Sequence, residues 1–383
     1  MSLQVGIIAP PWLPVSSASP GSTESMVDRL ARGLEDAGCQ VVLFATGDAT
    51  CPVERRWYFP SALGQVEDGR AEMIHVERAY RELAGVDVIH DHTLAGLSRT
   101  GIGDRSVPTV VTAHRELTRD LRRQYTEAAV HVMITAVSWS QRRMAPEVPV
   151  AAVIHHGLVT AEYPVGGDHK EYVLFMGRMH PHDGAHRAIL AARTAGKRIM
   201  LTGRVHEPAE RRYFTTAVAP LLGEDAVYLG DVTGDTRLAL LAGAEALVRP
   251  IRRAEPFSLP MVESLACGTP VVTFPDGATR EILDHGVTGF VCADDAEMAR
   301  ELSHVADLDR ARCRTTVQVR FSVERMVRAY IDVYRRAAGA STVSERARRR
   351  RNSRVVPLPI IPGRRSPLRR PITRVQPVAE AMD

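Results

Sequence analysis

Two glutamates stand on either side of a predicted helix start, Glu255 just before it and Glu263 one turn inside it. Between them, the amide groups of Phe257, Ser258 and Leu259 point out of the helix start, where they have no intrahelical acceptor. A helix N-terminus of this kind binds an anion such as a phosphate. The segment therefore predicts an anion site between two carboxylates, which suits a ligand with a central diphosphate and hydroxyl groups at both ends.

The helix that carries this site is predicted for Leu259–Cys267. Ser258 is expected to cap it, and Pro260 falls in the first turn, where its missing N–H costs little. Gly268 and Pro270 are expected to end the helix.

The elements that position this segment alternate regularly between strand and helix. Strands of a first series are expected at Val5–Ala9, Val41–Thr46, Val86–His90, Thr109–Ala113, Val132–Ala136 and Ala151–His155. Those of a second series are expected at Tyr172–Met176, Ile199–Thr202, Ala226–Leu229, Ala246–Val248, Val271–Phe274 and Phe290–Cys292. Helical stretches lie between most of them, and this alternation indicates parallel sheets with helices on both faces. Two series predict two doubly wound α/β domains.

The predicted boundaries divide the chain into four parts. Residues 1–157 and 158–322 are expected to be the two α/β domains, joined by a linker over Gly157–Lys170. A helix over 323–340 follows, with apolar residues on one face. The remaining residues, 341–383, contain a run of arginines and six prolines from Pro357 to Pro377, which predicts a disordered basic tail.

The segment from Glu255 to Pro270 resembles the E-x7-E motif of the family-4 retaining glycosyltransferases. The likeness extends through Val271-Val272 and to Gly286–Val291, and it covers the chain from about Val5 to Tyr334. It implies a GT-B fold, in which two Rossmann-like domains face each other across a cleft. By this resemblance Glu255 contacts the donor sugar and Glu263 holds the ribose of the nucleotide.

Two other places resemble the same family. Gly21, in the loop between the first strand and the first helix, corresponds to part of a glycine loop that approaches the donor phosphates; Ser22 replaces the second glycine. Arg178 follows the first predicted strand of the second domain. At this position the family has an arginine that contacts the diphosphate. Guanidinium–phosphate bonding is the physical basis of that role.

One position departs from the family pattern. Asp183 stands where a lysine normally supplies the second diphosphate cation. We expect Asp183 to be turned aside and Arg187, one helical turn further on, to supply the charge; His182 and His186 are the other neighbouring candidates.

Histidines mark the ends of two strands in the first domain. His92 and His114 are expected at the crevice edge, where parallel strands end, and are candidates for contact with the acceptor or the donor sugar. The spacing of His90 and His92 is typical of some metal sites, but no third and fourth ligands stand in evident register, so no metal is expected. The pair His155-His156 is interpreted as structural.

Composition places the chain among globular proteins and limits its partners. Of 383 residues 45% are hydrophobic and 25% charged, and no apolar run is long enough to span a membrane. Five scattered cysteines are typical of a reduced, cytoplasmic protein. The tail carries eleven arginines against three acids, so the rest of the chain is mildly acidic, which excludes nucleic acid as a stable partner and leaves weak tail contacts with acidic surfaces open.

The resemblance implies a retaining hexosyltransferase that needs neither a cofactor nor a metal. Its partners would be a nucleotide-sugar donor, expected to be a UDP-sugar, and an acceptor that the sequence does not identify. Two alternatives stay open: a sugar-nucleotide epimerase on the same fold, and a non-catalytic GT-B protein used for binding or assembly.

Overall fold

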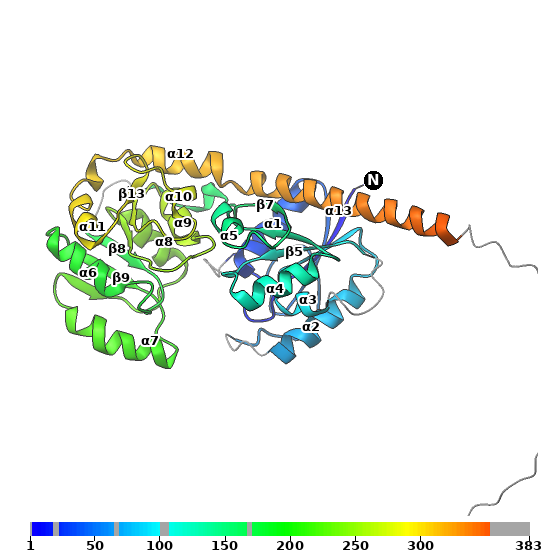
Figure 1. Ribbon diagram of the computed structural model, residues 1–383. Helices are drawn as coiled ribbons and strands as arrows, with labels where there is room; N and C mark the ends of the chain where they lie inside the picture. The colour runs from blue at the N-terminus through cyan, green and yellow to red at the C-terminus, as the bar shows by residue number, and fades with distance from the viewer. Residues whose placement is uncertain (1, 18–22, 65–68, 100–106, 167–170, 353–383) are drawn as a thin grey trace, which may run out of the picture. The chain divides into compact units, whose positions relative to one another are not determined.

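The computed structural model describes residues 2–17, 23–64, 69–99, 107–166 and 171–352. Two parallel β-sheets form within these residues, each covered by helices (Figure 1). Both sheets belong to the compact unit Met1–Ser341. The GT-B prediction of two doubly wound α/β domains is thereby confirmed.

In the first sheet, successive strands are added toward one edge and then, after a switch at the centre, toward the other edge. Its strands, from edge to edge, are β3 (Glu54–Trp57), β2 (Gln40–Ala45), β1 (Gln4–Ile8), β4 (Val88–Asp91), β5 (Thr109–Ala113), β6 (Met133–Ala136) and β7 (Val150–Val153). All neighbours pair in parallel. The chain order reverses between β1 and β4, and such a switch point opens a crevice at the carboxyl ends of the strands.

The second sheet repeats this arrangement. Its strands are, in spatial order, β10 (Ala226–Tyr228), β9 (Ile199–Thr202), β8 (Val173–Met176), β11 (Leu247–Arg249), β12 (Val271–Thr273) and β13 (Gly289–Val291). They are again parallel, and the order reverses between β8 and β11. The second crevice therefore lies where β8 and β11 end.

Helices occupy the connections between the strands. Those of the first sheet are α1 (Thr23–Asp36), α2 (Gly69–Glu82), α3 (Ala95–Arg99), α4 (Arg119–Ala128) and α5 (Trp139–Met144). Those of the second are α6 (Ala185–Thr194), α7 (Pro208–Tyr213), α8 (Gly234–Gly243), α9 (Leu259–Ala266), α10 (Thr279–Ile282), α11 (Asp295–Glu301) and α12 (Arg310–Arg320), before the last helix, α13 (Val323–Asn352). Short 3-10 or π-helical turns cover Thr160–Glu162, Phe214–Val218, Ala219–Leu221 and Val305–Asp307.

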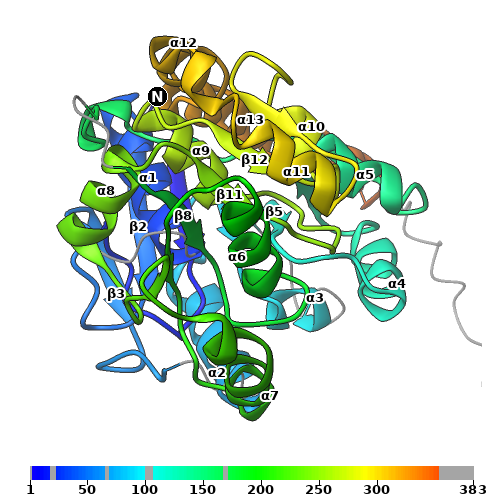
Figure 2. The same ribbon diagram turned by 90° about the vertical axis from the view of Figure 1, so that its left-hand side faces the viewer.

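In each domain, alternate side chains of a strand point to opposite faces of the sheet and pack into two separate core layers. Ile7 and Leu43 pack with α1, whereas Ile8 and Phe44 pack on the opposite face with Ala79 of α2. In the second sheet one face packs on α9 and α12 and the other on α6 and α11 (Figure 2). Because both faces are buried, the strands are continuous apolar runs, which is why most of them were predictable.

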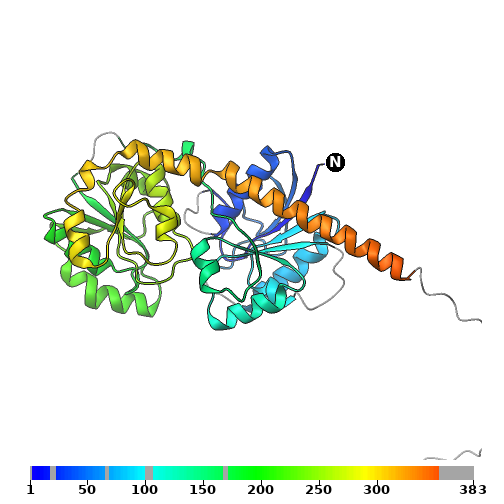
Figure 3. The ribbon, with the colours of Figure 1, turned by 45° about the horizontal axis from the view of Figure 1, so that its top comes forward.

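The last helix completes the core of the first domain. Tyr330 and Tyr334 of α13 are fully buried, and the hydroxyl oxygen of Tyr334 lies 2.7 Å from Nδ1 of His90. Figure 3 shows the start of α13, in orange, along the first domain. Val327 packs so closely on α1 that a Cβ added to Gly33 would lie 2.7 Å from Cγ2 of Val327. The chain thus returns from the second domain to the first.

Two connections between the sheets lie side by side. The amide of Leu158 donates to the carbonyl of Phe321 at 2.8 Å, and the amide of Val323 donates back to Leu158 at 3.1 Å. A Cβ on Gly157 would lie 2.6 Å from the carbonyl oxygen of Ser322. The close approach of these two segments therefore requires glycine at position 157.

Several predicted elements need correction or fall outside the described residues. The last helix, predicted to end at Ala340, continues to Asn352, while the rest of the predicted tail, 353–383, lies outside the described residues. Strand β3 was not predicted, because its sequence Glu54-Arg55-Arg56-Trp57 is polar and pairs only at the sheet edge. No helix within the described ranges has the length and apolar composition to cross a membrane.

Candidate active site

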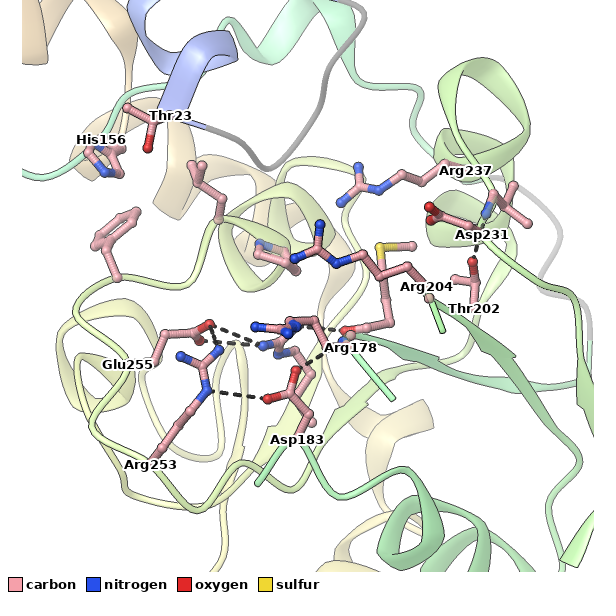
Figure 4. A pocket seen from close by; sticks show the side chains of 18 of the residues that line it. Thr23, His156, Arg178, Asp183, Thr202, Arg204, Asp231, Arg237, Arg253 and Glu255 are labelled. Atoms are coloured by element: carbon pink, nitrogen blue, oxygen red, sulfur yellow. Dashed lines mark hydrogen bonds and ion pairs between the residues drawn. The ribbon is translucent and has the colours of Figure 1, made fainter. Parts of the chain in front are cut away.

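A cavity of about 330 Å³ opens where the strands of the second sheet end. Its walls come from the loops after β8, β9 and β11 and from the segment before α9, and it is also lined by Thr23, His114 and His156 of the first domain. Figure 4 shows these side chains around the cavity, with Glu255, Arg253 and Asp183 joined by dashed lines. Residues from both domains therefore contribute to one site.

The start of α9 borders this cavity. Phe257, Leu259 and Pro260 line it, and Gly268 at the other end of the helix has a φ of 77°, which favours glycine. Ser258 occupies the N-cap position, but its hydroxyl makes no capping hydrogen bond, which corrects the predicted cap. Its Oγ atom is buried without a partner among the described residues.

Glu255 lies on the cavity wall between two arginines. Its Oε1 accepts from Nη2 of Arg253 at 3.0 Å and lies 3.3 Å from Nη2 of Arg249. Arg249 is the last residue of β11 and only 3% exposed, and its Nη1 donates to the carbonyl oxygen of Met176. Its Nε has no partner among the described residues, although it is buried.

Asp183 is not turned away from the cavity, which corrects the prediction. It lines the cavity, is only 4% exposed, and accepts at Oδ2 from the backbone amide of Arg178 at 3.0 Å. Its Oδ1 lies 3.2 Å from Nε of Arg253. Arg187, by contrast, is bonded to Asp295 at 2.7 Å and is not among the residues that line the cavity. The assignment of Arg187 to the donor phosphates does not fit this geometry, because α6 directs its side chain toward α11.

Arg178 lines the cavity as expected, but it has carboxylate partners of its own. Its Nε donates to Glu210 at 2.6 Å and its Nη2 to Glu207 at 2.5 Å. Both glutamates belong to the start of α7, where Glu207 and Glu210 form a capping box. These bonds hold the guanidinium beside the loop that Asp183 anchors.

Glu263 lies behind the cavity wall rather than on it. Its side chain is fully buried, it accepts from Nη2 of Arg237, and it lies 3.3 Å from the hydroxyl of Tyr163. Arg29 of α1 donates to the same hydroxyl at 3.0 Å. Arg237 itself lines the cavity, and its Nη1 is buried without a partner among the described residues.

The histidines form a row that leads from the buried His92 to the half-buried His114 at the cavity. His114 lines the cavity, and Nδ1 of His92 lies 2.9 Å from its Nε2, one step behind the wall. His156 also lines the cavity, stacks on His114 at 5.5 Å and packs edge-on against Phe257, so the residue interpreted as structural lies at the cavity wall. Burial lowers the pKa of His92 and of His114 well below the usual range, and that of His156 to about 3. These rings are therefore neutral near pH 7.

The charge balance of the cavity favours an anion. Five arginines line it against three carboxylates, namely Arg178, Arg204, Arg237, Arg249 and Arg253 against Asp183, Asp231 and Glu255. Buried donors without partners also gather at this wall, on Arg237 and Arg249. Because buried donors are normally satisfied, they indicate a polar ligand that accepts hydrogen bonds. Among the described residues, no group of three or more His, Cys, Asp or Glu is arranged to hold a metal ion.

Sequence reasoning missed four of these arginines and His156. Arg204 follows β9 and Arg249 ends β11, so the rule that ligands bind at the carboxyl ends of parallel strands would have found both. Arg253 stands two positions before Glu255, where the expected motif drew attention to the glutamate alone. The predicted Gly21 lies outside the described residues.

Comparisons with known proteins match both halves of the chain. Residues 23–164 match the family described as "Glycosyltransferase Family 4", and residues 170–307 match "Glycosyl transferases group 1". A phosphatidyl-myo-inositol mannosyltransferase of Mycolicibacterium smegmatis is 27% identical over 351 residues, 81% of this chain and 86% of the relative. An MMP α-(1→4)-mannosyltransferase of Mycolicibacterium hassiacum is 28% identical over 54% of this chain and 58% of its own.

Solved structures share the same architecture. AviGT4, a glycosyltransferase involved in avilamycin A biosynthesis, has a TM-score of 0.67 at 26% identity and covers 88% of this chain and 98% of its own. Alr3699/HepE of Anabaena, solved with UDP and glucose, has a TM-score of 0.68 at 17% identity over 86% of this chain and 99% of its own. The second likeness shows the fold alone.

Proposed function

Because the chain belongs to the group 1 and family-4 glycosyltransferases, which have the GT-B fold, we propose that it is a retaining hexosyltransferase. It moves a sugar from a nucleoside diphosphate donor to an acceptor hydroxyl. The observation that carries this proposal is the cavity in front of α9, where arginines outnumber carboxylates and buried donors lack partners. A diphosphate is the part of the donor that meets both conditions.

The proposed pose runs the donor along this cavity. The diphosphate lies against the amides of Phe257, Ser258 and Leu259 and beside Arg178. The nucleoside lies toward Arg237, whose guanidinium contacts the ribose and is held from behind by the buried Glu263. The sugar lies between Glu255 and His114.

The chemistry then depends on stabilising the leaving group. As the bond to the anomeric carbon breaks, charge develops on the diphosphate, and the helix start and the arginines stabilise that charge. The acceptor hydroxyl attacks from the face that the diphosphate leaves and gives its proton to the departing diphosphate oxygen, so the anomeric configuration is retained. Neutral His114 can accept a hydrogen bond from a sugar hydroxyl, and its bond to His92 fixes which ring nitrogen is free.

Donor base, metal requirement and location are parts of the same proposal. We favour a UDP-sugar, since similar folds have been solved with UDP, although another has been solved with ADP. Metal-independence is supported by the arginines, which supply the positive charge that a metal ion would supply. A cytoplasmic location is supported by the five cysteines, which are free thiols and four of them buried.

The test is a transfer assay followed by proton NMR of the anomeric signals. The chain is incubated with UDP-glucose, ADP-glucose or GDP-mannose, first alone and then with a panel of sugar and polyol acceptors. The proposal expects a new glycoside with the anomeric configuration of the donor and release of the nucleoside diphosphate. An inverted product contradicts retention. A changed sugar without acceptor indicates an epimerase, and donor binding without any product indicates the non-catalytic alternative.

A further inference from the structure

We propose that Arg253 contacts the donor diphosphate and that Asp183 is the residue that positions it. This inference rests on the proposed function, since it assumes a nucleoside diphosphate in the cavity. It assigns to Arg253 the second cation that the sequence led us to seek at Arg187.

Asp183 is fixed too firmly to act as a free, repulsive charge. Its two oxygens accept hydrogen bonds from different partners: Oδ2 accepts from the amide of Arg178, and Oδ1 accepts from Nε of Arg253. Its own amide donates to the carbonyl of His180 at 3.0 Å, which closes the loop between β8 and α6. The tight fit shows at Gly177, where an added Cβ would lie 3.1 Å from Oδ2. Asp183 therefore joins the loop that carries Arg178 to the loop that carries Arg253.

Arg253 is held on two edges and left available on the third. Nε faces Asp183 and Nη2 faces Glu255, so two carboxylates fix the plane of the guanidinium. No described residue accepts a hydrogen bond from Nη1. Arg253 lines the cavity and its side chain is 35% exposed, so this free edge is accessible to a ligand (Figure 4).

The local charges support the same assignment. Asp183 and Glu255 are balanced by Arg253 and Arg249, so the acidic residue at position 183 does not leave this wall negative. Neighbouring arginines are engaged elsewhere: Arg187 pairs with Asp295, and the guanidinium of Arg252 lies 3.9 Å from the ring centre of Phe274. Arg252 does not line the cavity.

Calorimetric titration with UDP, ADP, GDP and the corresponding nucleosides tests the role of Arg253. Arg253→Gln should weaken binding of the preferred diphosphate by about tenfold or more, the scale of a lost hydrogen bond between charged groups. Binding of the matching nucleoside should be unchanged, which also shows that the variant is folded. Arg252→Gln and Arg187→Gln are the matched controls and should leave both affinities unchanged. If Arg253→Gln does not fold, Arg253→Met is measured in its place, because methionine keeps most of the side-chain stem.

Asp183→Asn tests the positioning role. The asparagine can still accept from the Arg178 amide but no longer holds Arg253 by charge, so diphosphate affinity should fall while nucleoside affinity does not. In the Arg253→Gln background the same change should have little further effect, because the two residues act as one unit. Tighter diphosphate binding by Asp183→Asn, or equal binding by Arg253→Gln and Arg252→Gln, overturns the inference. If the unmodified chain binds no nucleoside diphosphate, it is the proposed function that fails.

Discussion

Nδ1 of His92 lies 2.9 Å from Nε2 of His114, and this pair links the end of β4 to the wall of the cavity. One ring must donate and the other accept, which requires both to be neutral or one to be charged at high cost in a buried place. Burial is the main cause that lowers both pKa values, and the neighbouring imidazoles lower them further. The pair is therefore a neutral element that fixes the orientation of His114.

Stability should fall as the pH decreases below about 6.5. Five histidines have a lower pKa in the folded chain than in the unfolded chain, namely His75, His90, His92, His114 and His156. As the pH falls, the unfolded chain therefore binds protons first, which favours unfolding. Each histidine contributes about 1.4 kcal/mol per pH unit until its folded pKa is reached. Asp91 has the opposite effect on stability. Burial raises its pKa to about 6, so the folded chain binds this one proton before the unfolded chain does. Urea unfolding between about pH 7.5 and 5.5 measures the slope.

Two variants check the source of that slope. His92→Gln and His75→Gln should each reduce it, because each removes a histidine whose pKa is lowered by burial. A stability that stays constant or rises as the pH is lowered would contradict neutral buried histidines.

Glu263→Gln should weaken nucleoside binding by about 1–3 kcal/mol, because the buried carboxylate that holds Arg237 at the proposed ribose position loses its charge. The glutamine is preferred to alanine, since its amide oxygen can still accept from Arg237, whereas alanine leaves that buried guanidinium without its acceptor. Calorimetric titration with the nucleoside alone measures the effect. Affinity equal to that of the unmodified chain would remove the ribose assignment.

The fold was largely predictable because both sheets are buried on both faces. Val5, Leu43 and Leu174 belong to apolar runs whose length and spacing leave few alternatives to parallel strands. Strand β3 lacked that signal, because an edge strand with one neighbour can remain polar. The end of α13 was missed because its residues beyond Ala340 show no apolar periodicity.

The site was predictable only where a local motif pointed to it. Glu255 and Arg178 lie on the cavity wall, as their positions beside α9 and β8 suggested. The position of Asp183 between Arg178 and Arg253 depends on a contact between residues 70 positions apart, and no local spacing reports such a contact. Glu263 was placed correctly on the helix, but its burial behind Arg237 depends on tertiary packing.

Chelation of metals should leave transfer activity unchanged. Arginine side chains supply the positive charge beside the proposed diphosphate position, and they do not depend on divalent ions. The measurement compares initial rates with EDTA, with added Mg²⁺ and with added Mn²⁺. Loss of activity in EDTA that either ion restores would refute metal-independence.

A chain that ends at Ala340 should keep its melting temperature. Among the residues of α13 whose side chains the structure describes, the buried ones extend through Ala337, and this truncation keeps all of them. Tyr330→Ala is the matched control, and it should lower stability by about 3–5 kcal/mol because a fully buried aromatic ring is removed. Differential scanning calorimetry of both variants separates the two effects. A melting temperature that falls by many degrees on truncation would show that residues beyond Ala340 contribute to the fold.

The central claim is that the cavity in front of α9 binds a nucleoside diphosphate sugar, and calorimetric titration of the unmodified chain with UDP-glucose, ADP-glucose and GDP-mannose tests it most directly. We expect saturable binding of one molecule of donor per chain, weakened by salt and tighter than binding of the bare nucleoside, because the arginines and the helix start act on the diphosphate. Absence of binding by all three donors, or equal affinity for a donor and its nucleoside, would contradict the account.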